Sequence, residues 1–349
     1  MRAAVIAFAL CLALVAPPAA TAELTDQQVI DLLATERPRD AAVRRALIYL
    51  RSLQKPNGAV GGEFPAALSA LALMAHLAAG HTPDDLAHGA WMRRSLVYVL
   101  DQQSDTGYFG KVDGSRMYGH GIVTLMLAET LGMCRDEDLD ERIRGALERA
   151  VAVTVNAAQV KKDDLHRGGW RYEPHENVSD LSLSGWQLMS LHATQQVGIT
   201  VPPEVIANAV AYARRLTTLD GKVGYDKPGD DHAALRGTAM LSLAIGGQGD
   251  APEVARIADR IHGDPITWQG PWFFYRCYYD AVGLARAAPQ VWVGYAPTLE
   301  AALVDHQNED GSWPAPPGDN EGGNGHVYRT SLAVLALAVN RQVLPAYQR

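Results

Sequence analysis

The sequence has few cysteines and no surplus of basic residues. It contains 3 Cys among 349 residues, and its formal net charge is −8. A nucleic-acid surface needs clustered Lys and Arg, and no basic run of that kind occurs, so nucleic acid is excluded as a partner. Cys134 and Cys277 lie 143 positions apart, which is no disulfide framework, and we prefer two buried free thiols.

Several other features are missing. After residue 23 no apolar run is long enough to cross a bilayer, and no strict apolar–polar alternation persists as it would in strands. The chain also lacks Gly-x-Ser-x-Gly, the phosphate-binding Gly-x-x-x-x-Gly-Lys, Cys-x-x-Cys and His-Glu-x-x-His. These absences exclude the common hydrolase, nucleotide-binding, thiol-redox and zinc-protease motifs.

The first 22 residues have the layout of a signal peptide. Arg2 gives a basic start, Ala3–Val15 is apolar, and Ala20–Ala22 is a small-residue cleavage site. We therefore expect residues 1–22 to be removed on export to the periplasm or the exterior. The remaining residues, 23–349, are expected to form one domain without a transmembrane anchor.

A repeated pattern runs through the rest of the chain. Each copy has a helix that often ends in Gln, then a Gly-rich turn with an aromatic residue, then a more apolar helix. The abundance of Gly (32) and Pro (19) reflects these turns. Six turn glycines mark the copies, at spacings of 49, 62, 52, 49 and 41 residues: Gly58, Gly107, Gly169, Gly221, Gly270 and Gly311.

The two helices of each copy differ in pattern. In 41–54 the apolar residues follow one stripe, whereas 65–80 is apolar all round, so the first helix is outer and the second inner. Short turns make each pair antiparallel, and six pairs without evident polar end caps favour a closed ring over an open solenoid. The expected fold is therefore all-α, an α/α toroid with the Gly-rich turns around one mouth.

At this level the sequence resembles the terpenoid-cyclase and protein-prenyltransferase repeat family. The resemblance covers most of residues 40–349. It is carried by the Gln-to-Gly-x-Trp element in 303–313, its weaker copies at Gln54 and Gln103, the stretch 167–172, and the ending 328–337. More narrowly, the chain is similar to the short, exported bacterial members of that family.

The resemblance implies two kinds of chemistry, and the residues depart from both. Class II cyclases protonate an alkene with an Asp-x-Asp-Asp motif; the matching segment here is Asn177–Asp180, with Ser179 at the donor position. Asp231 begins another inner helix without the upstream Asp. Cyclisation by the usual route is therefore doubtful, although Asp180 or Asp231 could act as a displaced acid.

Prenyltransferases of the family hold zinc with Asp, Cys and His. Here Tyr275 stands two residues before Cys277, where the family has Asp, while Asp280 lies three residues after it and His326 follows later. Cys277, Asp280 and His326 could bind zinc. A buried Cys without metal is the preferred interpretation, so we expect no cofactor.

Aromatic and polar residues near the inner-helix starts make up the predicted ligand site. Aromatic faces suit carbocations, sugars and apolar chains alike. Core packing is the alternative for the aromatics in 268–295, and helix capping the alternative for Asp180 and Asp231. The candidate binding residues are Tyr118, His120, Trp170, Tyr172, Trp186, His232, Arg236, Trp272, Tyr275, Tyr278, Tyr279, His326 and Tyr328.

Three functions remain open from the sequence. The favoured one is binding of a small apolar or isoprenoid-like ligand, or a peptide, in a central aromatic cavity. The second is a terpene-cyclase-like enzyme that uses Asp180 or Asp231. The third is a carbohydrate-active α/α barrel with these two carboxylates across the mouth.

Overall fold

The described part of the chain is built from α-helices that form two concentric rings. The computed structural model describes residues 36–321 and 325–341, and the helices belong to one compact unit, Pro38–Arg349. The outer ring consists of α2 (Pro38–Ser52), α4 (Gly89–Asp101), α6 (Glu137–Ala158), α8 (Pro203–Arg215), α10 (Pro252–Gly263) and α12 (Pro289–Val304). The inner ring consists of α3 (Pro65–Ala78), α5 (Arg116–Thr130), α7 (Leu181–Gln196), α9 (Arg236–Ile245), α11 (Phe273–Ala287) and α13 (Gly325–Ala338).

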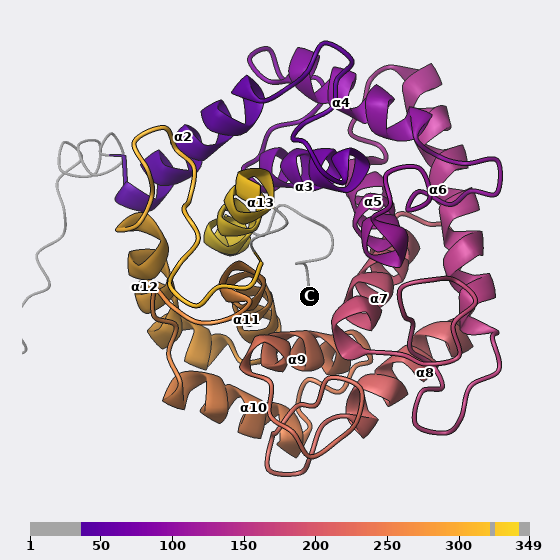
Figure 1. Cartoon of the computed structure of the whole chain (residues 1–349), viewed down its shortest axis with the longest axis vertical. Coiled ribbons are helices and arrows are strands. Elements are labelled where there is room, and N and C mark those ends of the chain that lie inside the picture. Colours follow the sequence, from indigo (N-terminus) through magenta and orange to yellow (C-terminus); the bar gives the residue numbers. More distant parts are fainter. Residues whose placement is uncertain (1–35, 322–324, 342–349) are drawn as a thin grey trace, which may run out of the picture. The chain divides into compact units, whose positions relative to one another are not determined.

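The ring closes. Figure 1 shows the inner helices following one another around a centre, with the outer helices outside them. Each inner helix packs against the next, and α13 returns to pack against α3, while α12 packs against α2. The α/α toroid predicted from the repeats is therefore confirmed, and the open solenoid is wrong for these residues.

Burial explains the two helix patterns. In α3 every residue from Ala66 to Ala78 is buried, because the helix contacts neighbours on all sides. The outer helix α8 buries only one stripe, which includes Val205, Ala209 and Tyr212. Short 3-10 turns at Ala233–Leu235 and Val339–Arg341 complete the helical structure. Within the described ranges, extended pairing is limited to isolated bridges such as Trp170 with Asp180.

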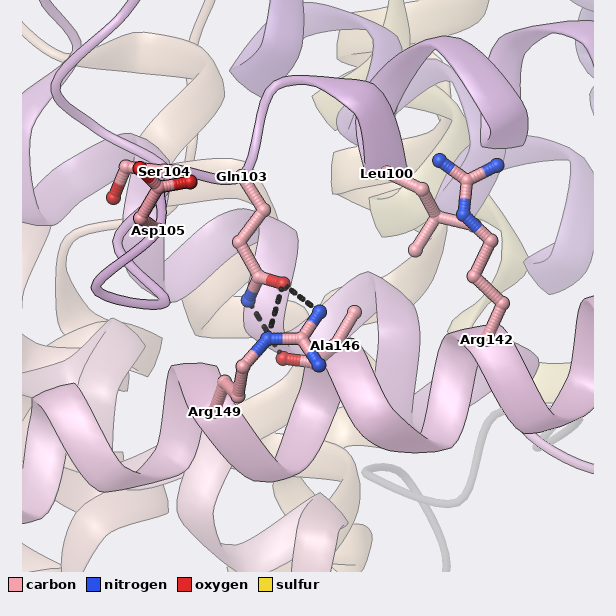
Figure 2. A pocket seen from close by; sticks show the side chains of 7 residues that line it. All are labelled: Leu100, Gln103, Ser104, Asp105, Arg142, Ala146 and Arg149. Carbon is pink, nitrogen blue, oxygen red and sulfur yellow. Dashed lines mark hydrogen bonds between the residues drawn. The ribbon is translucent and has the colours of Figure 1, made fainter.

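A glutamine clamp joins consecutive outer helices. The side-chain amide of Gln103, just after α4, donates to the carbonyl of Ala146 in α6 at 2.8 Å, and its oxygen accepts from Arg149 at 3.1 Å. Figure 2 shows this group at the edge of a surface hollow between the two helices. The amide group of Gln103 therefore bonds to a helix carbonyl and to a guanidinium at the same time. The polar residues of this hollow thus have a structural role.

The same clamp occurs at two other joints. Gln54 donates to the carbonyl of Trp91 at 2.9 Å and accepts from Arg94. Gln307 donates to the carbonyl of Ala42 at 2.8 Å and accepts from Arg45, so it ties the last outer helix to the first. The Gln that recurs in the sequence repeats thus has a physical role in closing the ring.

The turn glycines allow the outer helices to come this close. Gly311 has φ +91°, and a Cβ there would overlap the backbone carbonyl of Arg45; Gly58 has the same relation to Arg94. Only glycine accepts both the left-handed conformation and the contact. In the third copy this position is Gly168, with φ +90°, and the predicted Gly169 is one residue too late.

Two predictions, the signal peptide and the domain boundary after Ala22, lie outside the described residues. Across the described ranges, no helix combines the length and apolar character that crossing a membrane requires.

Both cysteines of the described residues are free thiols. Cys277 is buried, whereas Cys134 is only half-buried, so the prediction of two buried thiols is correct for Cys277 alone.

Removing the clamp that closes the ring should destabilise the protein. Gln307→Ala leaves the Ala42 carbonyl and Arg45 without their partner, and we expect a loss of about 1–3 kcal/mol in the free energy of unfolding. Urea denaturation measures it. The matched control is Gln248→Ala, which removes a surface contact with Arg214 and should cost less than about 0.5 kcal/mol. Equal effects of the two changes would argue against the clamp.

Candidate functional site

The N-termini of the inner helices are tied together by acceptors from neighbouring turns. Before α3, the carboxylate of Asp113 accepts from the backbone N–H of Ala66 at 3.1 Å and of Ala67 at 3.3 Å. At the start of α5, Met117 donates its backbone N–H to the Tyr172 carbonyl at 3.0 Å. Each acceptor comes from the turn of the following hairpin, so the free N–H groups of one helix are satisfied by its neighbour.

The pattern continues around the ring. Leu181, at the start of α7, donates its backbone N–H to the Tyr225 carbonyl at 2.8 Å. The Glu321 carboxylate accepts from the backbone N–H of Tyr275 at 3.0 Å and of Phe274 at 3.3 Å, in the first turn of α11. The first turns of α3, α5, α7 and α11 are therefore each bonded to the turn of the following hairpin at one mouth of the ring.

Three residues at this mouth have strained backbones. Phe64, Arg116 and Trp272 have φ of +46°, +56° and +56°, and they stand at the starts of α3, α5 and α11. Residues with a Cβ rarely adopt this region, and such strain often collects at binding sites. These strained residues therefore mark the mouth as a candidate binding site.

Asp180 is buried at this mouth and caps α7. It is fully buried, and its carboxylate accepts from the Leu183 N–H at 2.9 Å, the Ser182 hydroxyl at 2.6 Å and Arg171 at 3.0 Å. Burial raises its pKa, while these three donors act in the opposite direction. The capping role considered from the sequence is confirmed.

Tyrosine side chains surround this carboxylate. The Arg171 guanidinium lies over the rings of Tyr172, at 4.7 Å, and Tyr225, at 5.3 Å, and the two tyrosine hydroxyls are 3.2 Å apart. The Tyr118 hydroxyl is hydrogen-bonded to the Ser182 hydroxyl. These rings come from α5 and from two separate turns, so the ring closure brings them together.

Tyr328, in α13, completes the group. Burial, the nearby Glu321 carboxyl, and then Tyr118 and Tyr275 raise the pKa of Tyr328 well above its ordinary value. Tyr275, one of these neighbours, is itself hydrogen-bonded: its hydroxyl is 3.2 Å from the Thr238 hydroxyl. We call Tyr118, Tyr172, Tyr225 and Tyr328, which are all partly exposed, the tyrosine mouth.

Glu321 was missed by the sequence analysis. It is 1 % exposed, and burial together with Asp319 raises its pKa to about 8, against the lowering effect of the two backbone N–H groups. It lies in a Gly-rich turn without a recognisable motif. The preceding Asp319 and the start of α13 a few residues later were the only sequence signals near it.

Asp231 does not join Asp180. It forms ion pairs with Arg236 at 2.8 Å and Arg260 at 3.2 Å, and Arg236 also binds Asp264 at 2.8 Å. Burial opposes ionisation of Asp231, but the arginines hold its pKa below the ordinary value. Asp231 is therefore an ionised partner of arginines, not a proton donor, and no cap contact to α9 accompanies it.

Two predicted ligand residues point toward the outer ring. The imidazole Nδ1 of His120 accepts from the Phe109 N–H at 3.3 Å, and Nε2 donates to the Ala150 carbonyl of α6 at 3.1 Å. The Trp170 indole N–H donates to the Thr154 carbonyl at 3.0 Å. Both side chains are buried, so His120 and Trp170 hold α6 in place.

Several predicted cavity aromatics fill space themselves. Trp186 of α7 stacks on Tyr278 of α11 with ring centroids 5.7 Å apart, and Tyr279 lies edge-on to Trp186 at 5.5 Å. All three are fully buried. Trp186, Tyr278 and Tyr279 therefore pack against one another in the interior, as the alternative of core packing expects.

The remaining candidates lie apart. Trp272 is 46 % exposed beside the start of α11, and His232 and His326 are exposed. His232 contacts the Tyr225 ring edge-on at 6.3 Å. Of the predicted ligand residues, the structure brings Tyr118, Tyr172 and Tyr275 together near Asp180, and it places Tyr328 near Tyr118 and Tyr275.

The candidate zinc ligands do not converge. Asp280 accepts from Arg276 at 3.2 Å and from the Tyr295 hydroxyl at 3.1 Å, and Cys277 is buried, while His326 is exposed. Over residues 36–321 and 325–341, no group of three or more His, Cys, Asp and Glu side chains is arranged to hold a metal ion. Asp280 thus belongs to an ion-pair network around Arg276.

Comparison with known proteins shows the fold. No protein-family model and no curated protein sequence matches the chain. An inactive variant of the α-1,6-mannanase GH76A of Salegentibacter sp. HEL1_6, in complex with α-1,6-mannotriose, aligns with a TM-score of 0.64 at 10% identity, over 85% of this chain and 98% of that one.

Two further structures share this architecture. A protein from Actinoplanes aligns with a TM-score of 0.57 at 16% identity, over 86% of this chain and 98% of that one. A variant of the type II terpene cyclase MstE from Scytonema, in complex with geranylgeranyl dihydroxybenzoate, aligns with a TM-score of 0.54 at 15% identity, over 88% and 98%. At such identities the similarity establishes the α/α toroid and no shared activity.

His120 should make stability depend on pH below neutrality. Burial lowers its pKa from 6.5 to about 4, so as the pH falls below 6.5 the unfolded chain binds a proton that the folded chain does not. Stability is therefore lost between pH 6.5 and 4, by at most about 1.4 kcal/mol per pH unit from this residue.

The variant His120→Gln isolates this contribution. It should be less stable at pH 7, because two hydrogen bonds change, yet its urea-unfolding free energy should fall less steeply below pH 6.5. The difference in slope is the measured quantity. Parallel curves for the two proteins would show that His120 titrates normally in the folded state.

Proposed function

We propose that this chain is an exported ring protein that binds a small organic ligand, of isoprenoid kind, at the tyrosine mouth. The observation that carries the proposal is the convergence of three partly exposed tyrosines, from α5 and two turns, around buried Asp180, with Tyr328 of α13 beside Tyr118. Their ring faces offer apolar contact, and their hydroxyls offer hydrogen bonds. Export rests on the signal-peptide layout of residues 1–22.

The mouth suits a ligand with an apolar body and a polar end. Arg171 is fixed between two tyrosine rings and by its ion pair with Asp180, so its charge is already balanced. A strongly anionic group gains little from such a balanced cation, whereas hydroxyl or carbonyl groups can bond to the tyrosines. Another protein with this fold, a variant of the terpene cyclase MstE, was solved in complex with such a compound, geranylgeranyl dihydroxybenzoate.

The residues that match the cyclase acid motif favour binding over catalysis. Protonation of an alkene needs a carboxylic acid that is free to donate, but Asp180 caps α7 and is paired with Arg171. Ser179, which stands where the cyclase motif has its donor, gives its hydroxyl hydrogen to the His166 carbonyl and accepts from Lys162. The favoured function is therefore retention of a ligand rather than its cyclisation.

The two enzymatic alternatives use the same mouth and lose support here. A cyclase with a displaced acid and a carbohydrate-active barrel were both expected to use Asp180 or Asp231. Asp231 is engaged by Arg236 and Arg260. The mannanase was solved with α-1,6-mannotriose, so a protein with this fold can bind an oligosaccharide. The binding test therefore includes this sugar.

Binding should depend on the tyrosine mouth. We expect geranylgeraniol to bind the mature protein in native mass spectrometry and to raise its melting temperature, while α-1,6-mannotriose does neither. Tyr328→Ala should weaken binding at least ~10-fold, because it removes an aromatic contact surface of ~1–2 kcal/mol. Tyr98→Ala, a partly exposed tyrosine of the outer helix α4, is the matched control and should bind normally.

The outcomes separate the ligand classes. Binding of mannotriose in place of geranylgeraniol would overturn the isoprenoid proposal and favour the carbohydrate alternative. Equal affinities of the Tyr328→Ala and Tyr98→Ala proteins would remove the mouth as the binding site.

A product assay tests the catalytic alternative. Incubation with squalene and geranylgeranyl compounds is expected to give no cyclic product by mass-coupled gas chromatography, because Asp180 is held by three donors. If a cyclic product forms and Asp180→Asn abolishes it, the chain is a cyclase and the binding proposal fails. Asn retains the capping acceptor, so this variant is expected to fold.

A further inference from the structure

Three histidines gather at the end of α3 that lies opposite the mouth. His76 is in the last turn of α3, and His81 and His88 belong to the loop that leads to α4. The ring centroids of His76 and His88 are 5.4 Å apart, those of His81 and His88 are 3.8 Å apart, and those of His76 and His81 are 6.4 Å apart. The sequence analysis attached no function to them.

His76 presents a buried nitrogen without a partner. Its Nδ1 is 2.8 Å from the Ala72 carbonyl, which can only accept, so Nδ1 carries the hydrogen. The other nitrogen, Nε2, then has a free lone pair, and it is buried with no hydrogen-bond partner in a residue that is 0 % exposed. A carbonyl on the first nitrogen is also what orients histidines that bind metals.

His88 and His81 extend this arrangement. Nδ1 of His88 is likewise buried and without a hydrogen-bond partner. Nδ1 of His81 is 2.9 Å from the Asp85 carboxylate, and the His81 ring stacks on His88 with an angle of 21° between the planes. Asp85 thus fixes His81, and His81 fixes one face of His88.

Burial, reinforced by local charges, favours the neutral form of both imidazoles. Burial lowers the pKa of His76 to about 3, and the neighbouring histidines and Arg51 act in the same direction. Burial, His81 and Arg51 also lower the pKa of His88, against Asp85. Near pH 7 no proton therefore competes for the two unpartnered nitrogens, which is the state in which imidazole binds metals.

We propose that His76 Nε2 and His88 Nδ1 bind a transition-metal cation of the copper or zinc kind. Such a cation lies about 2.0–2.1 Å from each imidazole nitrogen, so two rings that share one have centroids about 5–6 Å apart, as these do. Among the described residues no third His, Cys, Asp or Glu is arranged with them to hold a metal, so water completes the coordination. Imidazole favours copper, zinc and nickel over hard cations.

Both ligand nitrogens are buried, so a cation enters from solvent by displacement of the His88 side of the pair. His88 is only partly buried, and its loop neighbour Leu86 is fully exposed. Asp85 places a carboxylate beside the rings and offsets the repulsion from Arg51. A two-histidine site with water ligands is exchangeable, and we expect micromolar rather than structural affinity. The site is separate from the tyrosine mouth, and it does not rest on the proposed function.

Trp91 provides a direct probe. Its ring stacks on His76 with centroids 4.3 Å apart, and bound Cu²⁺ quenches nearby indole fluorescence. Titration of the untagged protein with CuCl₂ at pH 7 should quench part of the tryptophan emission in a saturable way. Trp91→Phe should remove that component while isothermal titration calorimetry still shows binding, for Cu²⁺ and for Zn²⁺.

Ligand variants decide the proposal. His88→Gln, at a partly exposed loop position, should weaken binding at least ~10-fold, and His76→Gln should do the same if circular dichroism shows that it folds. His192→Gln, which removes an imidazole near Arg286 of α11, is the matched control and should bind as the parent does. Absence of a saturable Cu²⁺ or Zn²⁺ signal, or undiminished binding by His88→Gln, would overturn the proposal.

Discussion

The close approach of each Gly-rich turn to the next outer helix is the contact on which the ring depends. At Gly58 and Gly311 the glycine lies directly against a helix carbonyl, where any Cβ would overlap it. The adjoining glutamine then bonds the same neighbouring helix, so spacing and register are fixed together. Because the joint at Gln307 links the last outer helix to the first, small errors cannot be relieved at free ends as they can in a solenoid.

Ring closure in turn determines the chemistry of the mouth. Every inner helix begins on the same face, so that face collects unsatisfied N–H groups, and acidic side chains or carbonyls must meet them. Asp113, Asp180 and Glu321 serve this need. A carboxylate that accepts from the N–H groups of a helix start has its lone pairs occupied, as at Asp113 and Asp180. Glu321 differs, because burial and Asp319 raise its pKa to about 8 although both of its oxygens accept backbone N–H groups. The fold thus commits these three side chains to helix starts.

The architecture could be predicted from the sequence because it depends on periodic patterns. All-round apolar helices alternate with striped ones, and these patterns set the inner and outer rings. Local details were less predictable: Gly168 rather than Gly169 takes the left-handed turn, since either glycine satisfies the sequence pattern. The site was harder still, because it depends on partners distant in the chain.

Asp231 illustrates this difficulty. From the sequence it resembles Asp180, an acid before an inner helix, and only the folded positions of Arg236 and Arg260 distinguish the two. His120 likewise shares a helix start with Tyr118, but it turns outward to the Ala150 carbonyl. Glu321 and the histidine cluster carried no motif, because their environments are assembled from separate turns and helix ends.

The tyrosine mouth and the histidine cluster lie at opposite ends of the inner ring, and helix α3 runs from one end to the other. Helix α3 has 14 residues, so its ends are about 20 Å apart. Its first turn is capped by Asp113 at the mouth, and His76 lies in its last turn. Coupling over that distance needs an element with two alternative arrangements, and a helix buried along its whole length between α5 and α13 offers none. Metal binding at His76 and ligand binding at the tyrosine mouth should therefore contribute independently to the stability of the protein.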